Sequence, residues 1–317
     1  MSPYADAADL VERSAAAFAS GIPDQPADDG FFGPASVAWR ISGDLSAPVA
    51  GLRALMVQAL HPLAMAGVDQ HSDWRSDPVG RLAATSAYLA TITFGERAAA
   101  ERAAARVRRI HEHVTGVDPV TGKAYAAGDP ALLLWVHAAL VDSNVAARAL
   151  FGTALGADDA DRYIEEMVVA AELVGVSAEL VPDSAAALAR YLAGIRPQLV
   201  CTPAARESMA YLLDPPGLDE EIGEIWQDIR EATLIALPDW ARQLYGYSAP
   251  ELTGQRREEI RQALGVLDAV YLGEPGVLEA RQRITLRMRA YAGISAPGPA
   301  AAGGSGGRAP GPAAAHA

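Results

Sequence analysis

The chain has 317 residues, a formal net charge of −13 at pH 7 and one cysteine, Cys201. The acidic balance argues against nucleic acid or an anionic membrane as a partner, because both attract basic surfaces. A lone cysteine excludes an internal disulfide and any cysteine-rich zinc or iron–sulfur site. Half of the residues are hydrophobic, and alanine, the strongest helix former, is abundant. The composition leans towards helix and supplies enough apolar residues for a real core.

The ends of the chain and its longest apolar runs bear on targeting, membrane-spanning and disordered segments. The start, MSPYADAADL, has neither the basic region nor the apolar stretch of a signal peptide. With no uninterrupted run of about 18 apolar residues, no transmembrane helix is expected, and we predict a cytoplasmic protein. The Pro/Gly/Ala-rich residues 293–317 predict a disordered tail.

Helical patterns begin at the N-terminus. Residues 1–30 hold one short helix, Ala7–Ser20, and a polar loop. The stretch Gly51–Val68 is strongly apolar and predicts a buried helix, in which Pro62 marks either a kink or a break between two helices.

Aspartate followed by proline then signals the start of two helices, since aspartate caps the N-terminus and proline suits the first turn. The pair Asp77-Pro78 opens a helix that ends near Phe94-Gly95, and Asp129-Pro130 opens an apolar helix. Residues 96–114 form another helix, followed by a loop over 115–129. Further helices are expected at 158–174, 183–196, 203–213, 218–236, 248–270 and 275–291. Strand patterns are essentially absent. Residues 31–292 are predicted to form one large multi-helix domain.

Five of the six histidines lie between His61 and His137. Their spacing does not fit a zinc HExxH motif, because His111 and His113 lie about 200° apart around a helix. A di-iron bundle does not fit either, because no ExxH pair is repeated. Isolated histidines in apolar helices suit haem, which needs one imidazole and an apolar pocket. From the pattern alone, His111 and His137 are more often core or surface residues than ligands.

Arg81 and Thr85 are four residues apart and share one helix face. Such a pair can polarise a bound oxygen species or hold a carboxylate. Alternatively, Arg81 pairs with an acidic loop and the Thr85 hydroxyl bonds to its own helix.

The order of these motifs resembles the rubber oxygenase (latex-clearing protein) family. Its catalytic domain is shared with the fungal ER-bound oxygenase of mycophenolic acid biosynthesis, and it is also called the oxygenase MpaB family. The resemblance covers about residues 30 to 260. It rests on Trp39, Gln58 to Pro62, Ala66-Gly67-Val68, His71-Ser72, Asp77-Pro78, Arg81, Thr85, Phe94-Gly95, the HxxVxG motif at His111, Tyr125, Asp129-Pro130 and Trp135-Val136-His137.

The resemblance implies an all-α fold with a globin-like helical core around haem b, and O₂-dependent oxidative chemistry. It implies that His111 is the iron ligand and that Arg81 and Thr85 line the distal side. In the rubber-cleaving branch a lysine precedes that threonine. Here the position is Ala84, and Lys123 is the only lysine, which argues against polyisoprene as the substrate.

We therefore expect a haem b-dependent oxygenase that uses O₂ on a small apolar or isoprenoid-like substrate. His111 would bind iron, and Arg81 and Thr85 would contact both haem and the reacting groups. The alternatives are a haem-free helical protein that binds a lipid-like ligand and a partner-binding helical domain. A homodimer is compatible with the sequence.

The other histidines are expected to have supporting roles. We expect His61, His71 and His137 to be structural or to support the pocket, with His61 bonding a carbonyl freed at the kink. His71 is expected in a loop, and His113 is expected to be solvated at a helix end.

Overall fold

A computed structural model describes residues 7–215, 218, 220–274 and 276–293 of the chain. Apart from Gly293, the predicted disordered tail lies outside the described residues. Within them, the α-helices are α1 (Ala7–Ser20), α2 (Val37–Ser42), α3 (Ala47–Ala59), α4 (Pro62–His71), α5 (Pro78–Phe94), α6 (Arg97–His111), α7 (Pro130–Phe151), α8 (Asp159–Glu166), α9 (Val168–Val174), α10 (Ala185–Ile195), α11 (Pro203–Leu213), α12 (Glu220–Ala236), α13 (Asp239–Tyr245), α14 (Gly254–Gly273) and α15 (Val277–Tyr291). Two 3₁₀ turns, η1 (Ala178–Leu180) and η2 (Arg196–Gln198), flank α10. The predicted all-α class is confirmed.

One small sheet interrupts the helices of the described residues. Strands β1 (Thr115–Val117) and β2 (Ala124–Ala126) pair antiparallel, with Gly116 opposite Tyr125. The prediction of a loop over this segment is therefore wrong. Strands of three residues are too short to show alternating polarity, so only their pairing reveals them.

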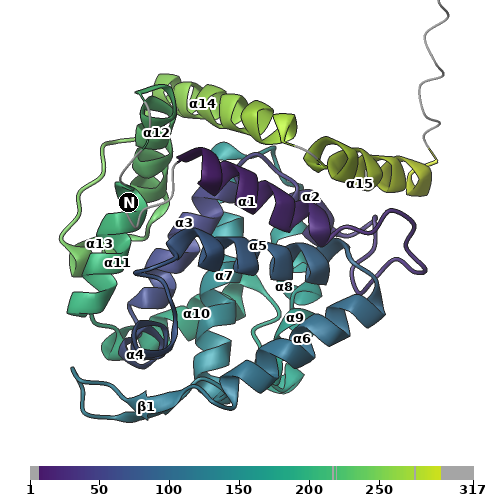
Figure 1. Ribbon diagram of the computed structural model, residues 1–317. Coiled ribbons are helices and arrows are strands. Elements are labelled where there is room, and N and C mark those ends of the chain that lie inside the picture. The colour runs from purple at the N-terminus through teal and green to yellow at the C-terminus, as the bar shows by residue number, and fades with distance from the viewer. Residues whose placement is uncertain (1–6, 216–217, 219, 275, 294–317) are drawn as a thin grey trace, which may run out of the picture.

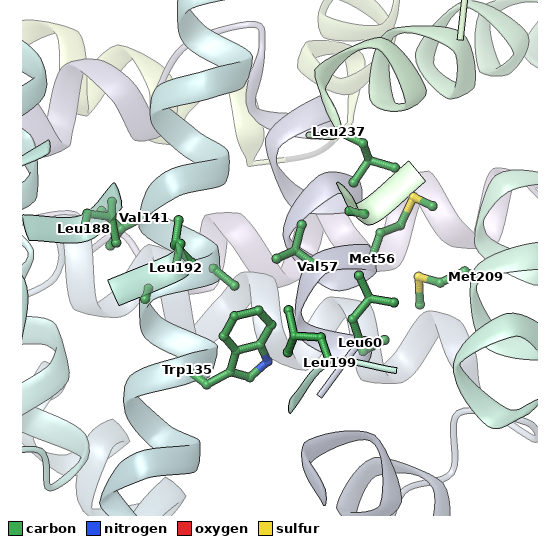
Figure 2. Close-up of a cluster of buried hydrophobic side chains, with 14 of the residues drawn as sticks. Met56, Val57, Leu60, Trp135, Val141, Leu188, Leu192, Leu199, Met209 and Leu237 are labelled. Carbon is green, nitrogen blue, oxygen red and sulfur yellow. The ribbon is translucent and has the colours of Figure 1, made fainter. Parts of the chain in front are cut away.

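Helices α3 and α7 pack against each other at the centre of the bundle, and the other helices surround them (Figure 1). Figure 2 shows the core where they meet, with the Trp135 indole beside Val57 and Leu199. Trp135 is fully buried, and its indole N–H donates to the Gln58 carbonyl at 3.0 Å. The aromatic ring thus fills the core, and its polar atom is satisfied by the end of α3.

A buried arginine links three of the central helices. Arg53, on α3, is only 3% exposed. Its guanidinium donates to Asp142 Oδ2 at 2.6 Å, to Ser143 Oγ at 2.7 Å and to the Ala236 carbonyl at 2.8 Å. Because a buried charge is tolerated only when it is paired and hydrogen-bonded, these contacts fix α3 against α7 and α12.

The apolar stretch around Pro62 forms two helices rather than one. α3 ends at Ala59, α4 begins at Pro62, and the axes are bent by 103°. Proline lacks an N–H to continue the hydrogen bonding of α3 but suits the first position of α4. Of the two alternatives in the sequence, the break is therefore the correct one.

The two aspartate–proline pairs act as predicted. Asp77 accepts a hydrogen bond from the Gly80 N–H at 2.9 Å, and Asp129 accepts one from the Ala131 N–H at 2.8 Å. These caps begin α5 and α7 at the following prolines.

Other boundaries differ from the prediction. The helix expected over 158–174 is two helices, α8 and α9, separated at Met167, and α14 begins at Gly254 rather than at 248. The short helices α2 and α13, of 6 and 7 residues, were not predicted. Helices this short have too few turns to display a periodic pattern.

α7 is the one helix of the described residues that is long and apolar enough to cross a membrane, and 56% of its most apolar window is buried inside the protein. The bent pair α3–α4 also passes this test when taken as one span. Length and composition alone do not distinguish a membrane span from a core helix. The expectation of no transmembrane helix stays a prediction.

Candidate functional site

A cavity of about 310 Å³ lies between the N-terminal half of α5, the end of α6, the β hairpin and helices α3, α4, α7 and α11. Most of its wall is apolar, with leucine, valine, methionine and alanine side chains from these elements. Arg81, Thr85 and His111 all line it. The structure thus brings together the three predicted site residues, although two lie on α5 and one on α6.

Arg81 and Thr85 occupy neighbouring turns of α5 on the face that borders the cavity. The Thr85 hydroxyl donates to the Arg81 carbonyl at 3.0 Å, so the predicted bond to its own helix is present. Arg81 is solvent-accessible, but its guanidinium makes no ion pair or hydrogen bond with any described residue. The alternative in which Arg81 pairs with an acidic loop is therefore wrong.

The cavity walls exclude water from part of the Arg81 guanidinium. Desolvation lowers the pKa of this group from its ordinary value, and no acidic neighbour opposes the effect. Arginine nevertheless stays protonated at neutral pH. The cavity therefore contains an unpaired positive charge with several free N–H donors, which is the chemistry needed to bind an oxygen atom or a carboxylate.

His111 is the last residue of α6, and its imidazole makes no hydrogen bond with any described residue. The Nδ1 atom is buried and unpartnered, so Nε2 is the ring nitrogen that remains accessible. Burial lowers the pKa of His111, and the positive charge of Arg81 lowers it further. The imidazole is therefore neutral at pH 7 and carries the free lone pair that a metal ligand requires.

The turn between α5 and α6 explains how these residues meet. α5 ends at Phe94, Gly95 follows, and α6 begins at Arg97 and returns past α5 (Figure 1). Phe94 is 1% exposed and packs edge-on against Trp39 at 5.2 Å between ring centroids. This anchored corner brings the end of α6 back to the beginning of α5.

The remainder of the HxxVxG motif has a packing role. Val114 lines the cavity, and Gly116 lies opposite Tyr125 in the hairpin. A Cβ atom on Gly116 would lie 2.7 Å from the Tyr125 hydroxyl oxygen and 2.9 Å from Gln70 Oε1. The Tyr125 hydroxyl donates to the same Gln70 oxygen at 2.9 Å. Glycine at position 116 therefore makes room for a buried tyrosine that forms part of the cavity wall.

The loop between α4 and α5 supplies Trp74, which no sequence motif had indicated as a site residue. Trp74 is 7% exposed and lines the cavity. Arg75 lies 4.2 Å from the centroid of that ring and pairs with Asp69 at 2.7 Å and Glu207 at 2.8 Å. These ion pairs hold the loop, and with it Trp74, between α4 and α11.

α11 forms a further part of the wall that was not predicted. Ser208, Met209 and Leu212 lie on one helix face and line the cavity. The helical spacing of these three residues predicts a buried helix face, but it does not predict that the face borders a cavity.

The other histidines of the predicted cluster occupy separate positions. His71 is the last residue of α4 rather than part of a loop, lines the cavity, and has its Nε2 atom 3.1 Å from the Thr115 carbonyl. His61 does not line this cavity, and its Nδ1 atom is buried without a partner, so the expected bond to a freed carbonyl is absent. Burial lowers the pKa of His137, which also lies outside the cavity, to about 4. His113 is exposed beyond the end of α6, as expected.

Comparison with known proteins bears on the whole of this region. Residues 39–269 match the family described as "ER-bound oxygenase mpaB/B'/Rubber oxygenase, catalytic domain". Comparisons with curated proteins and with solved structures gave no match, so the globin-like character of the core stays a prediction. The matched segment contains every residue of the cavity and most of the chain. The chain therefore belongs to the ER-bound oxygenase mpaB/rubber oxygenase family and carries its oxygenase catalytic domain.

Proposed function

We propose that this oxygenase depends on haem b and uses O₂ to oxidise a small apolar or isoprenoid-like substrate. One observation carries the proposal. A largely apolar cavity contains a neutral imidazole with an accessible nitrogen, His111, together with the unpaired guanidinium of Arg81.

The donor set of the cavity fits a haem. Within the described residues, no group of three or more His, Cys, Asp or Glu side chains could hold a metal ion. A non-haem iron site needs several such ligands, whereas haem supplies four from its own ring and needs a single imidazole from the protein. The cavity volume of about 310 Å³ lies at the lower end of the usual range for small-molecule pockets, about 300–1,000 Å³.

In this proposal His111 would hold the iron, and Arg81 and Thr85 would contact the bound group and the substrate. When bound, haem supplies the redox chemistry that activates O₂. Arg81 would donate hydrogen bonds to an oxygen atom that gains negative charge during the reaction. The Thr85 proton is engaged with the Arg81 carbonyl, which leaves its oxygen lone pairs available as acceptors. The apolar walls would hold an apolar substrate and exclude water.

Ala84 supports a substrate other than polyisoprene. It lies on α5 directly before Thr85 and carries no polar atom, in the place where the rubber-cleaving relatives have a lysine. α5 therefore contributes no amine to the cavity.

The test of haem dependence is the visible spectrum of full-length protein purified from a haem-supplemented culture. We expect a Soret band that is lost in His111→Ala and retained in the matched control His113→Ala, which removes an exposed histidine two residues away. Colourless wild-type protein, or a His111→Ala variant with an unchanged Soret band, would contradict the proposal.

Substrate class is tested separately, by O₂ consumption with a short isoprenoid, with polyisoprene latex and with no substrate. We expect consumption above the no-substrate rate only with the short isoprenoid. Turnover of latex at an equal rate would show that Ala84 does not restrict the substrate.

A further inference from the structure

A second groove, of about 350 Å³, lies away from the oxygenase cavity. It is formed by the break between α3 and α4 together with α7, α10 and η2. α7 contributes to both sites, because Ala131 and Leu134 border the groove while Leu133 and Val136 border the cavity. The two sites share no lining residue.

His61 is the buried polar residue of the groove. It is only 5% exposed, and its imidazole makes no hydrogen bond with any described residue. Nδ1 is shut off from solvent, which leaves Nε2 as the ring nitrogen that a ligand in the groove could reach, since His61 lines the groove. Buried polar groups in folded proteins nearly always have a partner. The buried Nδ1 atom has no partner among the described residues, and Nε2, which also has none, is free to hydrogen-bond a ligand in the groove.

The remaining polar side chains of the groove can all donate hydrogen bonds, and two of them, Gln198 and Tyr191, can also accept. Arg190 makes no ion pair with any described residue, and the side chains of Gln198 and Tyr191 make no hydrogen bond within the same part of the chain. No aspartate or glutamate lines the groove. With His61, all four side chains can donate, and Arg190 carries a positive charge that no carboxylate in the groove offsets, so the groove favours a hydrogen-bond acceptor that carries negative charge.

The apolar part of the groove restricts the ligand further. Leu134 and Ile195 contribute hydrocarbon surface between these donors. One cation suits a monoanion better than a multiply charged phosphate, and hydrocarbon surface suits an apolar body. Burial lowers the pKa of His61, so its imidazole stays neutral at pH 7 and adds a donor without adding charge.

We propose that this groove is a binding site for a small organic carboxylate, with the carboxylate held by His61 Nε2–H and Arg190 and the apolar body packed on Leu134 and Ile195. The proposal is independent of haem, because none of these residues lines the oxygenase cavity.

The experiment uses full-length protein with ¹³C-labelled histidine rings, titrated with sodium hexanoate and followed by NMR. The His61 signal is identified by its absence from the spectrum of His61→Gln. We expect a saturable shift of that signal by hexanoate and a much smaller effect of hexan-1-ol, which has the same chain length without the charge. In Arg190→Gln the hexanoate affinity should fall about tenfold, the loss expected for one charge-assisted hydrogen bond.

The matched control is Arg162→Gln, which removes an exposed arginine from α8 that makes no ion pair with a described residue. It should leave the hexanoate affinity unchanged. The proposal is overturned if hexanoate does not shift the His61 signal, or if hexan-1-ol shifts it equally. It is also overturned if the two arginine variants lose affinity equally, or if inorganic phosphate binds as tightly as hexanoate.

Discussion

Tyr125 occupies the space that any side chain at Gly116 would need. The two residues are opposite each other in the hairpin, and a Cβ atom on Gly116 would lie 2.7 Å from the tyrosine oxygen. Because Tyr125 also lines the oxygenase cavity, this packing connects the end of the HxxVxG motif to the shape of the site.

Replacing Gly116 with alanine should therefore displace Tyr125 and break its hydrogen bond to Gln70. We expect a loss of about 1–3 kcal/mol in the free energy of unfolding, the usual cost of overpacking. The Soret absorbance per mole of protein should fall as well. Urea unfolding and visible spectroscopy measure the two effects.

Gly128→Ala is the matched control for that change. The nearest atom to a Cβ at position 128 is the His111 carbonyl oxygen at 4.0 Å, an ordinary contact distance. A Gly116→Ala variant that is as stable as Gly128→Ala would show that Tyr125 moves without cost.

Arg81→Gln tests the proposed role of the unpaired guanidinium. Removing a donor aimed at a developing negative charge typically costs about 10²-fold in rate or more. We expect substrate-dependent O₂ consumption to fall by about that factor, with the Soret band retained. Arg109→Gln, which removes an exposed arginine from α6, should leave the rate unchanged. Equal rates of O₂ consumption in the two variants would show that Arg81 has no role in the reaction.

The lowered pKa of His137 predicts how stability depends on pH. The pKa of His137 is about 4 in the folded protein and about 6.5 when unfolded. Between these values the unfolded chain binds more protons, so the free energy of unfolding falls as the pH drops from about 6.5 towards 4. The slope due to His137 is at most about 1.4 kcal/mol per pH unit.

In His137→Gln this part of the pH dependence should disappear, whereas His113→Gln, at an exposed position, should match the wild type. Urea unfolding at pH 7 and pH 5 measures the difference. Identical pH dependence in the wild type and His137→Gln would contradict the burial of a neutral imidazole.

Arg53→Ala should be among the most damaging single changes in the core. It removes the buried guanidinium that joins α3, α7 and α12 and leaves Asp142 and Ser143 without their donor. Breaking a buried ion pair typically costs about 3–5 kcal/mol, which urea unfolding would detect.

The control for Arg53 is an exposed ion pair. Asp239, whose side chain is 82% exposed, pairs with Arg242 on α13, and Asp239→Ala should cost less than about 1 kcal/mol. If Arg53→Ala and Asp239→Ala lower the free energy of unfolding equally, the burial of Arg53 does not make its ion pair more stabilising than an exposed one.

The parts of the fold that were predictable from sequence are those with local causes. α5 and α7 begin where Asp77 and Asp129 cap them, because capping involves only a few consecutive residues. The hairpin and the wall from α11 depend on contacts between distant segments, which no local pattern records.

In the candidate site, too, features with local causes were predictable from the sequence, whereas those that depend on distant contacts were not. The spacing of Arg81 and Thr85 places them on one helix face, and the family resemblance singled out His111. That His111 lies beside Arg81 depends on the turn at Gly95 and on the packing of Phe94 against Trp39. His61 was expected to satisfy a local carbonyl, but its ring turns towards the groove, because side-chain direction at a helix break is set by tertiary packing.

The chain turns by 103° between α3 and α4, so the number of residues between these two helices affects the shape of both binding sites. α3 and α4 each contribute to the oxygenase cavity, and His61, at the corner, lines the groove. One inserted residue would rotate the following helix by about 100°, exchanging the faces that α4 presents to its neighbours. Substitutions at this corner are therefore better tolerated than insertions or deletions, which would alter the shape of both sites in a single step.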